Sequence, residues 1–444
     1  MNKTEIIELL SDWNFWVETP DTGVERKEYI SRLRSMLESD QVIVITGVRR
    51  SGKSFLMKQL AESLITKDGI PRNEILIINF EDPRFSDLNA RLLQRIYEVY
   101  LEFLHPENIP YVFLDEVQEV DNWEKWVRTA QELKKARVII SGSNARLLSR
   151  ELSTLLTGRH MDITVFPLSF KEYLLFNNLT IRNSLDLVSK KVEINRFLRQ
   201  YLELGAFPDV VLHKRKEEIL LSYYEDIIYK DLIRRYRVRK PESLKSLARY
   251  YLSNVSNLST YNSTEKFLNI SADTIEKYSG YLEAAYLNYF LKRHSFKVKE
   301  QEKSPRKVYT IDSGLANLIG FRFSENIGRT AENAVFLELK RRQVNIVDSE
   351  LFYWKDEHHR EVDFALQIGT KIGELIQVCW KLSSPQADKR EIRSLIKALN
   401  IFDLDRGLII TEEDEREEEI KGKRIVYIPL WKWLLSPFGA NVEK

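Results

Sequence analysis

Eight residues near the start of the chain, GVRRSGKS (47–54), place glycine, lysine and serine at the spacing that binds the phosphates of a nucleotide. Gly47 and Gly52 put no Cβ between the backbone and a phosphate chain, so the amides can point inward at the start of a helix. Lys53 then reaches the β- and γ-phosphates, and the Ser54 hydroxyl is placed to bind magnesium. The sequence therefore predicts an ATP and Mg²⁺ site whose nucleotide-binding residues are Gly47, Val48, Arg49, Arg50, Ser51, Gly52, Lys53, Ser54 and Phe55.

A pair of adjacent acids follows a later apolar run, in YVFLDEVQ (111–118). Asp115 ends this strand-like run, where a carboxylate can hold the water shell of magnesium. Glu116 comes directly after it and is placed to orient or deprotonate the attacking water. An acidic turn after a strand is the plainer interpretation, but the phosphate loop upstream disfavours it. Together the two motifs favour hydrolysis of ATP over binding alone.

Short polar residues end the next strand-like run, in SGSNAR (141–146). Ser141, Ser143 and Asn144 would leave the sheet beside the strand of Asp115. Asn144 is the first choice for a catalytic side chain that holds the γ-phosphate or the lytic water, and Ser143 is the second. The same residue types also suit turns and helix caps, so both interpretations stay open.

Three arginines near these motifs have roles that the sequence leaves open. Arg49 and Arg50 lie inside the loop and either touch phosphate or face a partner surface. Arg159 follows a glycine and could supply positive charge to the transition state of its own or a neighbouring subunit's nucleotide. A surface arginine after a helix C-cap is an equally good interpretation of Arg159.

The elements that must position these residues are short apolar runs separated by helix-like segments. The runs are 42–46, 75–80, 111–115, 137–141 and 162–166. Wholly apolar strands that alternate with helices predict an α/β fold, with a parallel sheet covered on both faces. Ligands gather at the carboxyl ends of such strands, which is where the polar motifs fall.

Length and composition set outer limits. A chain of 444 residues suggests about three domains. Its formal charge is +2 with 30% charged residues, so any basic surface has to be local. The single cysteine, Cys379, excludes an intramolecular disulfide and fits a reducing compartment. No apolar run approaches the ~20 residues that span a bilayer, so we expect a cytoplasmic protein without a membrane segment.

Taken together, the motifs resemble those of the AAA+-related ATPases of archaea and bacteria. The resemblance covers GVRRSGKS, FEDPRF (80–85), FLDEVQEVDNWEKW (113–126), SGSNARLLSRELSTLLTGR (141–159) and PLSFKEY (167–173), and later LGAFPD (204–209), YTIDSG (309–314), GRTAENAVFLEL (328–339) and REVDF (360–364). It implies Walker A roles for Lys53 and Ser54, and Walker B roles for Asp115 and Glu116. It also implies a sensor near Ser143 and Asn144, a finger at Arg159, and a winged helix and a restriction-endonuclease-like tail after the ATPase module.

The middle of the chain has two candidate DNA contacts. The first is the basic run 230–240, which is either a solvated helix face or a phosphate contact. The second is a winged helix over 241–320, whose third helix carries Asp273 and Glu276 and whose expected strand pair is more basic. That wing holds Lys292, Arg293, Lys297, Lys299, Lys303, Arg306 and Lys307. Winged helices bind proteins as well as DNA, so both partners stay open.

The tail has an incomplete set of nuclease residues. A PD-(D/E)XK site needs an acid on one strand and an acid-x-lysine pair on the next. Asp363 fits the first position and Glu332 could approach from the preceding helix, but the second strand carries Gln377 and Cys379. Lys381 shares the face of Cys379 and is a candidate substitute. We expect a degenerate site that does not cut nucleic acid, in a domain that serves for docking to a protein partner or for dimerisation.

These observations predict four regions, which are 1–180 (P-loop ATPase), 181–240 (helical connector), 241–320 (winged helix) and 321–444 (smaller α/β nuclease-like domain). The favoured function is a magnesium-dependent ATPase that acts on nucleic acid, most simply DNA, as a homo-oligomer. Two alternatives remain, a nucleotide-dependent switch that recruits proteins and an ATP-coupled nuclease.

Overall fold

The computed structural model describes residues 1–144, 159–320, 327–344, 346–381 and 385–436. Its contacts divide the chain into two compact units, Met1–Phe166 and Pro167–Lys444. The helix expected within 149–158 lies outside the described residues. Among the residues that are described, no helix is both long and apolar enough to cross a membrane.

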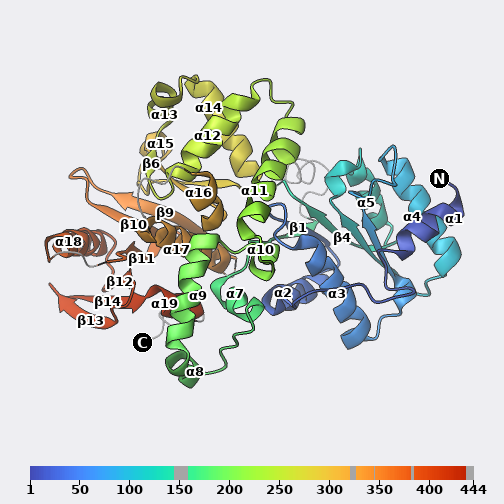
Figure 1. Ribbon diagram of the computed structural model, residues 1–444, viewed down its shortest axis with the longest axis horizontal. Coiled ribbons are helices and arrows are strands. Elements are labelled where there is room, and N and C mark those ends of the chain that lie inside the picture. The colour runs from blue at the N-terminus through green and yellow to red at the C-terminus, as the bar shows by residue number, and fades with distance from the viewer. Residues whose placement is uncertain (145–158, 321–326, 345, 382–384, 437–444) are drawn as a thin grey trace. The chain divides into compact units, whose positions relative to one another are not determined.

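The first unit is built on a five-stranded parallel sheet with the order β2-β3-β4-β1-β5. Its strands are β1 (Val42–Thr46), β2 (Ile75–Asn79), β3 (Tyr111–Asp115), β4 (Arg137–Gly142) and β5 (His160–Thr164). Its helices are α1 (Lys3–Ser11), α2 (Lys27–Leu37), α3 (Lys53–Asp68), α4 (Ala90–Leu104) and α5 (Trp123–Glu132), with short 3-10 turns η1 (Arg72–Glu74) and η2 (Val117–Glu119). The expected α/β fold with a parallel sheet is confirmed (Figure 1).

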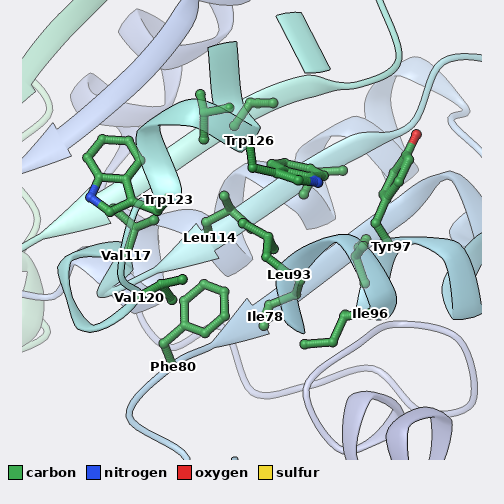
Figure 2. Packing of buried hydrophobic residues seen from close by; sticks show 14 of the residues in the cluster. Ile78, Phe80, Leu93, Ile96, Tyr97, Leu114, Val117, Val120, Trp123 and Trp126 are labelled. Atoms are coloured by element: carbon green, nitrogen blue, oxygen red, sulfur yellow. The ribbon is translucent and has the colours of Figure 1, made fainter. Parts of the chain in front are cut away.

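Strand residues alternate between two separate cores, as the two-residue period of a strand requires. Val42 and Val44 belong to one core with side chains of α1, α4 and α5, whereas Ile43 and Ile45 belong to the other with α2 and α3. Figure 2 shows part of the first core, which joins Trp123 and Trp126 of α5 with Leu93 of α4; Trp123 lies beside Val117. Because both faces are covered, the strands read as continuous apolar runs in the sequence.

The second unit begins with helices. They are α7 (Phe170–Phe176), α8 (Ser184–Ser189), α9 (Lys191–Leu204), α10 (Pro208–Leu212) and α11 (Lys216–Asp226), and α11 continues into a π-helix, η3 (Ile227–Arg234). Three more helices follow, α12 (Pro241–Ser253), α13 (Tyr261–Leu268) and α14 (Ala272–Ala284). A three-stranded antiparallel sheet accompanies them with the order β6-β8-β7, formed by β6 (Leu258–Ser259), β7 (Asn288–Leu291) and β8 (Arg306–Thr310).

The wing differs from the strand pair and charged loop that the sequence predicted. β7 ends at Leu291, and the expected tip instead forms helix α15 (Val298–Lys303). The amides of Glu300 and Gln301 both donate to the Lys297 carbonyl, and Lys297 pairs with the Glu300 carboxylate at 3.1 Å. Lysine, glutamate and glutamine are good helix formers, and such side-chain pairs support a short helix.

The chain ends in a six-stranded mixed sheet with the order β13-β14-β12-β11-β10-β9. Its strands are β9 (Ser349–Lys355), β10 (Glu361–Ile368), β11 (Lys371–Val378), β12 (Arg406–Thr411), β13 (Arg416–Ile420) and β14 (Lys423–Pro429). The accompanying helices are α16 (Ser313–Ile319), α17 (Ile327–Gln343), α18 (Pro385–Ile401) and α19 (Leu430–Leu435). α18 packs through Leu395 and Leu399 against Val362 and Leu375 of the sheet, and α17 packs through Phe336.

A buried carboxylate joins the early and late parts of the second unit. Asp312, at the N-terminus of α16, accepts hydrogen bonds from the amides of Ala206 (2.6 Å) and Leu315 (3.2 Å). Gly205 lies against this carboxylate with φ +77°, and a Cβ there would meet Asp312 Oδ1 at 1.9 Å. Glycine is therefore needed at position 205 both for its backbone conformation and for space.

We predict that Gly205→Ala lowers the free energy of unfolding of the second unit by at least ~3 kcal/mol, because the new methyl displaces a buried, hydrogen-bonded carboxylate. Gly422→Ala is the matched control, since Gly422 has φ +73° with nothing within 4 Å of its Cβ position. The control should lose only about 1 kcal/mol, from left-handed backbone strain. Urea unfolding of the full chain measures both, and equal losses would contradict the prediction.

Candidate nucleotide-binding site

The loop between β1 and α3 has the backbone of a phosphate cradle. Gly47 has φ +143° and Gly52 has φ +97°, and α3 begins at Lys53. A Cβ on Gly47 would lie 2.2 Å from the Val165 carbonyl oxygen, because the chain after β5 passes directly beside the loop. The first glycine is thus required by close packing as well as by phosphate access.

The Lys53 ammonium is buried beneath this loop, with 4% of the residue exposed. It donates to the carbonyls of Gly47 and Val48, both at 3.2 Å. It also lies 3.4 Å from Glu116 Oε1. The lysine of the first motif and the second acid of the other motif are therefore brought together as an ion pair at the carboxyl end of the sheet.

Asp115 and Ser54 form the second half of the site. The Ser54 hydroxyl hydrogen-bonds with the Asp115 carboxylate, which also accepts a hydrogen bond from Ser141 Oγ. Burial and the neighbouring Glu116 charge raise the pKa of Asp115, while Ser141, Ser54 and Lys53 oppose that rise. An adjacent hydroxyl and carboxylate are the hard oxygen donors that Mg²⁺ prefers, so these residues fit a magnesium ion.

Further metal ligands are not assembled there. Within the described part of the chain, no three His, Cys, Asp or Glu side chains are placed to hold a metal. This agrees with a Mg²⁺ that takes Ser54 and Asp115 from the protein and its other oxygens from phosphate and water. When bound, the ion would neutralise negative charge on the phosphates.

Glu116 is held in an unusual conformation. Its φ of +52° is left-handed, which costs energy for a residue with a side chain. Its amide donates to Ser141 Oγ at 3.0 Å, and its carboxylate accepts from Gln118 Nε2 at 2.5 Å. Ser141 thus fixes both acids, a role that the sequence did not assign to it. The signal for this role in the sequence was the position of Ser141 on the strand next to β3.

The remaining candidates near the loop differ in their burial and in their partners. Ser143 and Asn144 are fully buried directly after β4, where the sensor assignment remains a prediction. Arg49 pairs with Glu81 at 2.6 Å, Arg50 is exposed, and Phe55 is 42% exposed on α3. Arg49 is therefore turned toward an acid that follows β2.

Arg159 is on the opposite edge of the sheet. It precedes β5, its carbonyl accepts from the Val42 amide at the start of β1, and its guanidinium pairs with Glu132 at 2.8 Å. The phosphate loop follows the other end of β1. A strand of this length is about 16 Å long. Arg159 therefore lies away from the phosphate loop of its own chain, so a finger role would have to be toward a neighbouring subunit, and the interpretation as a surface arginine stays open.

Arg26 is a loop-positioning residue that the sequence did not reveal. It is 3% exposed and caps the start of α2. Its guanidinium donates to the Ser51 carbonyl at 2.9 Å and to the Phe166 carbonyl at 3.1 Å. The phosphate loop and the last residue of the first unit therefore share one buried cation.

In the tail, Glu332 and Asp363 both lie next to Lys307, and Gln377 lies next to Asp363, while a nuclease-like role for these residues stays a prediction. β10 has an irregular register at Asp363, whose amide donates to Gln377 Oε1 at 3.2 Å. Such irregularities re-aim side chains in strands. The lysine at this place is Lys307 from β8, which contacts both acids.

Two expectations about lysines are corrected here. Lys307 was assigned to the basic wing, but it is 2% exposed and ion-paired, so it cannot touch DNA phosphates. Lys381, the candidate substitute, is exposed. Cys379 Sγ lies 3.9 Å from the Lys381 carbonyl oxygen.

Comparisons with known proteins agree with the first unit's fold. An AAA domain profile matches residues 39–174, and profiles of two domains of unknown function, DUF8612 and DUF4143, match 195–325 and 327–433. An uncharacterized protein of Methanocaldococcus jannaschii is 34% identical over 412 residues, 89% of each chain. One of Haemophilus influenzae is 31% identical over 416 residues, 92% of this chain and 98% of its own. A Walker-type ATPase structure from Pyrococcus abyssi, 16% identical with a TM-score of 0.43, covers 69% of this chain and 99% of its own.

We predict that Lys53→Ala lowers ATP affinity at least ~100-fold, because it removes the charge that meets the phosphates. Glu116→Gln should keep ATP affinity within about threefold and lower turnover at least ~100-fold, since its role is toward water. Lys67→Ala, at the exposed end of the same helix, is the control. Calorimetric ATP binding and phosphate release measure both effects. Normal turnover of the Glu116→Gln protein would exclude Glu116 as the base.

Proposed function

The chain belongs to one family of P-loop ATPases with its M. jannaschii and H. influenzae relatives, and from this premise we propose that it hydrolyses ATP with magnesium and couples hydrolysis to nucleic acid. The observation that supports hydrolysis is that Lys53, Asp115 and Glu116 are buried together at the carboxyl ends of the strands, with the Ser54 hydroxyl beside Asp115. Binding alone would not require a second buried acid beside the first.

The ion pair between Lys53 and Glu116 links binding to chemistry. Arriving phosphates draw the ammonium away from the carbonyls of Gly47 and Val48 and from the Glu116 carboxylate. Glu116 is then released to accept a proton from the attacking water, while Ser141 keeps its backbone in place. Nucleotide binding and activation of the base are thereby two consequences of one lysine movement.

Nucleic-acid binding is best supported by the end of the 230–240 run. Lys230 and Arg235 are ion-paired with Asp226 and Asp231. The exposed residues that follow are Arg234, Arg237, Arg239 and Lys240. The wing is weaker than its composition suggested, since Lys292 and Arg306 pair with Glu302, Lys297 pairs with Glu300, and Lys307 is buried. A flexible, exposed cation can approach a phosphate at less cost than one that must first leave a carboxylate.

A protein-recruiting switch is the second candidate. The observation in its favour is an apolar strip on α8 and the start of α9, where Leu185, Val188 and Val192 are each more than three-quarters exposed. Exposed apolar groups of this kind mark protein contacts more often than nucleic-acid contacts. The two candidates differ in whether DNA changes the rate of ATP turnover.

We predict that duplex DNA binds through phosphates and raises ATP turnover. Replacing Arg234, Arg237, Arg239 and Lys240 with Gln should reduce the slope of log affinity against log salt by about 0.9 for each lost contact. The Lys299→Gln/Lys303→Gln variant tests the wing and should have a smaller effect, and Lys134→Gln/Lys135→Gln is the control. Anisotropy titrations across a salt series measure the slopes. Salt-independent binding, or turnover that DNA leaves unchanged, would favour the protein-recruiting switch.

We also propose that the active form is an oligomer in which Arg159 serves the neighbouring subunit. Arg159→Ala and Glu116→Gln proteins should each be inactive alone. An equal mixture should recover about a quarter of the wild-type turnover, because some interfaces then join an intact Glu116 to an intact Arg159. Phosphate release during titration of one variant into the other tests this. Full activity of Arg159→Ala alone, or no recovery in the mixture, would contradict it.

A further inference from the structure

A lysine ammonium is buried among three carboxylates where the tail meets the three-stranded sheet. Lys307 Nζ lies 2.6 Å from Asp363 Oδ1, 2.9 Å from Glu361 Oε1 and 3.1 Å from Glu332 Oε1. The side chains come from β8, β10 and α17. Lys307 and Asp363 are buried, and Glu332 and Glu361 are mostly covered. We call these three acids with Lys307 the ammonium cluster.

Each carboxylate also has a second partner besides Lys307. Asp363 Oδ2 accepts from the Val378 amide at 2.9 Å, and Glu361 Oε2 pairs with Lys355 at 3.1 Å. Tyr309, two residues beyond Lys307 on the same face of β8, donates its hydroxyl to Glu332 Oε1 at 2.7 Å. The acids are therefore held in place around one point, and the ammonium occupies it.

The charges in the cluster support a permanently charged ammonium. Burial alone would lower the pKa of Lys307, but Asp363, Glu332 and Glu361 together raise it well above its usual value. Burial and the charge of Asp363 raise the pKa of Glu332 to about 7.

We propose that the Lys307 ammonium is the resident cation of this carboxylate site and excludes a divalent metal from it. Carboxylate oxygens are the hard donors that Mg²⁺ and Mn²⁺ prefer. Arranged around the ammonium, these three acids are not placed to hold a metal, in agreement with the absence of such a group among the described residues. Here a positive charge sits within 3.1 Å of all three acids, so an incoming metal meets repulsion and finds its ligands engaged. Removing the ammonium leaves three closely spaced carboxylates, of which Asp363 is buried, without the cation that compensates them.

The test is Mn²⁺ binding by the full chain without nucleotide, followed by electron paramagnetic resonance. Lys307→Ala should bind one additional Mn²⁺ at least ~10-fold more tightly than any site of the wild-type protein. It should also melt at a lower temperature than wild type, because of the uncompensated acids, and recover part of that loss with Mn²⁺. The melting temperature of the wild-type protein should not respond to Mn²⁺.

Two further variants keep the test decisive. Lys307→Ala/Asp363→Asn should lose both the additional Mn²⁺ and the thermal recovery, which assigns the metal to this cluster. Lys307→Met keeps most of the side-chain volume and is used if Lys307→Ala does not fold. If neither folds alone, refolding with Mn²⁺ decides, since recovery supports the proposal and failure to recover overturns it.

Three results would overturn the proposal. They are Mn²⁺ binding by wild type that disappears in Asp363→Asn, a folded Lys307→Ala protein whose Mn²⁺ binding equals that of wild type, and Asp363-dependent cleavage of DNA by wild type. We expect no cleavage of linear, branched or single-stranded DNA, because Gln377 and Cys379 stand where an acid and a lysine would be needed. These outcomes are independent of ATP turnover, so a failed proposal here leaves the ATPase proposal standing.

Discussion

Burying a lysine ammonium costs several kcal/mol of hydration free energy. In each unit of this chain, neighbouring carboxylates compensate a buried lysine ammonium. In the first unit, Lys53 is paired with Glu116 beneath the phosphate loop. In the second, Lys307 is held by Asp363, Glu361 and Glu332. The two ammonium groups differ in what can replace their partners. Phosphate can reach Lys53 through the loop, whereas the partners of Lys307 are side chains of the protein itself.

The sheet of the first unit explains why the chemistry gathers at one edge. β1, β3 and β4 are parallel neighbours in the order β3-β4-β1, so their carboxyl ends bring Lys53, Asp115 and Ser141 together. The opposite edge holds Arg159 and its partner Glu132, which accounts for its separation from the loop. Parallel pairing thus determines both which groups meet and which cannot.

The grouping of Lys53, Ser54, Asp115 and Glu116 was predictable, because these residues are recognised by local spacing and by the strands that precede them. The parallel sheet was predictable for the same reason, since each strand is a short apolar run. The order of the strands in the sheet was not predictable. The surroundings of Lys307 were also out of reach, because its partners are 25 to 56 positions away in the chain. A charged residue in a basic stretch looks the same in a sequence whether its partner is water or a buried acid.

Arg26 gives the first unit a mechanical property. Its guanidinium holds the carbonyls of Ser51, in the phosphate loop, and Phe166, where the chain leaves the unit. Leaving either of these buried N–H groups of the guanidinium without its acceptor costs roughly 1 to 3 kcal/mol of stability. A shift of the loop therefore either pulls the exit of the chain with it or breaks a bond that water cannot readily replace. Movement of the phosphate loop is thereby coupled to the residue at which the chain leaves the first unit, because the Arg26 guanidinium bonds directly to both.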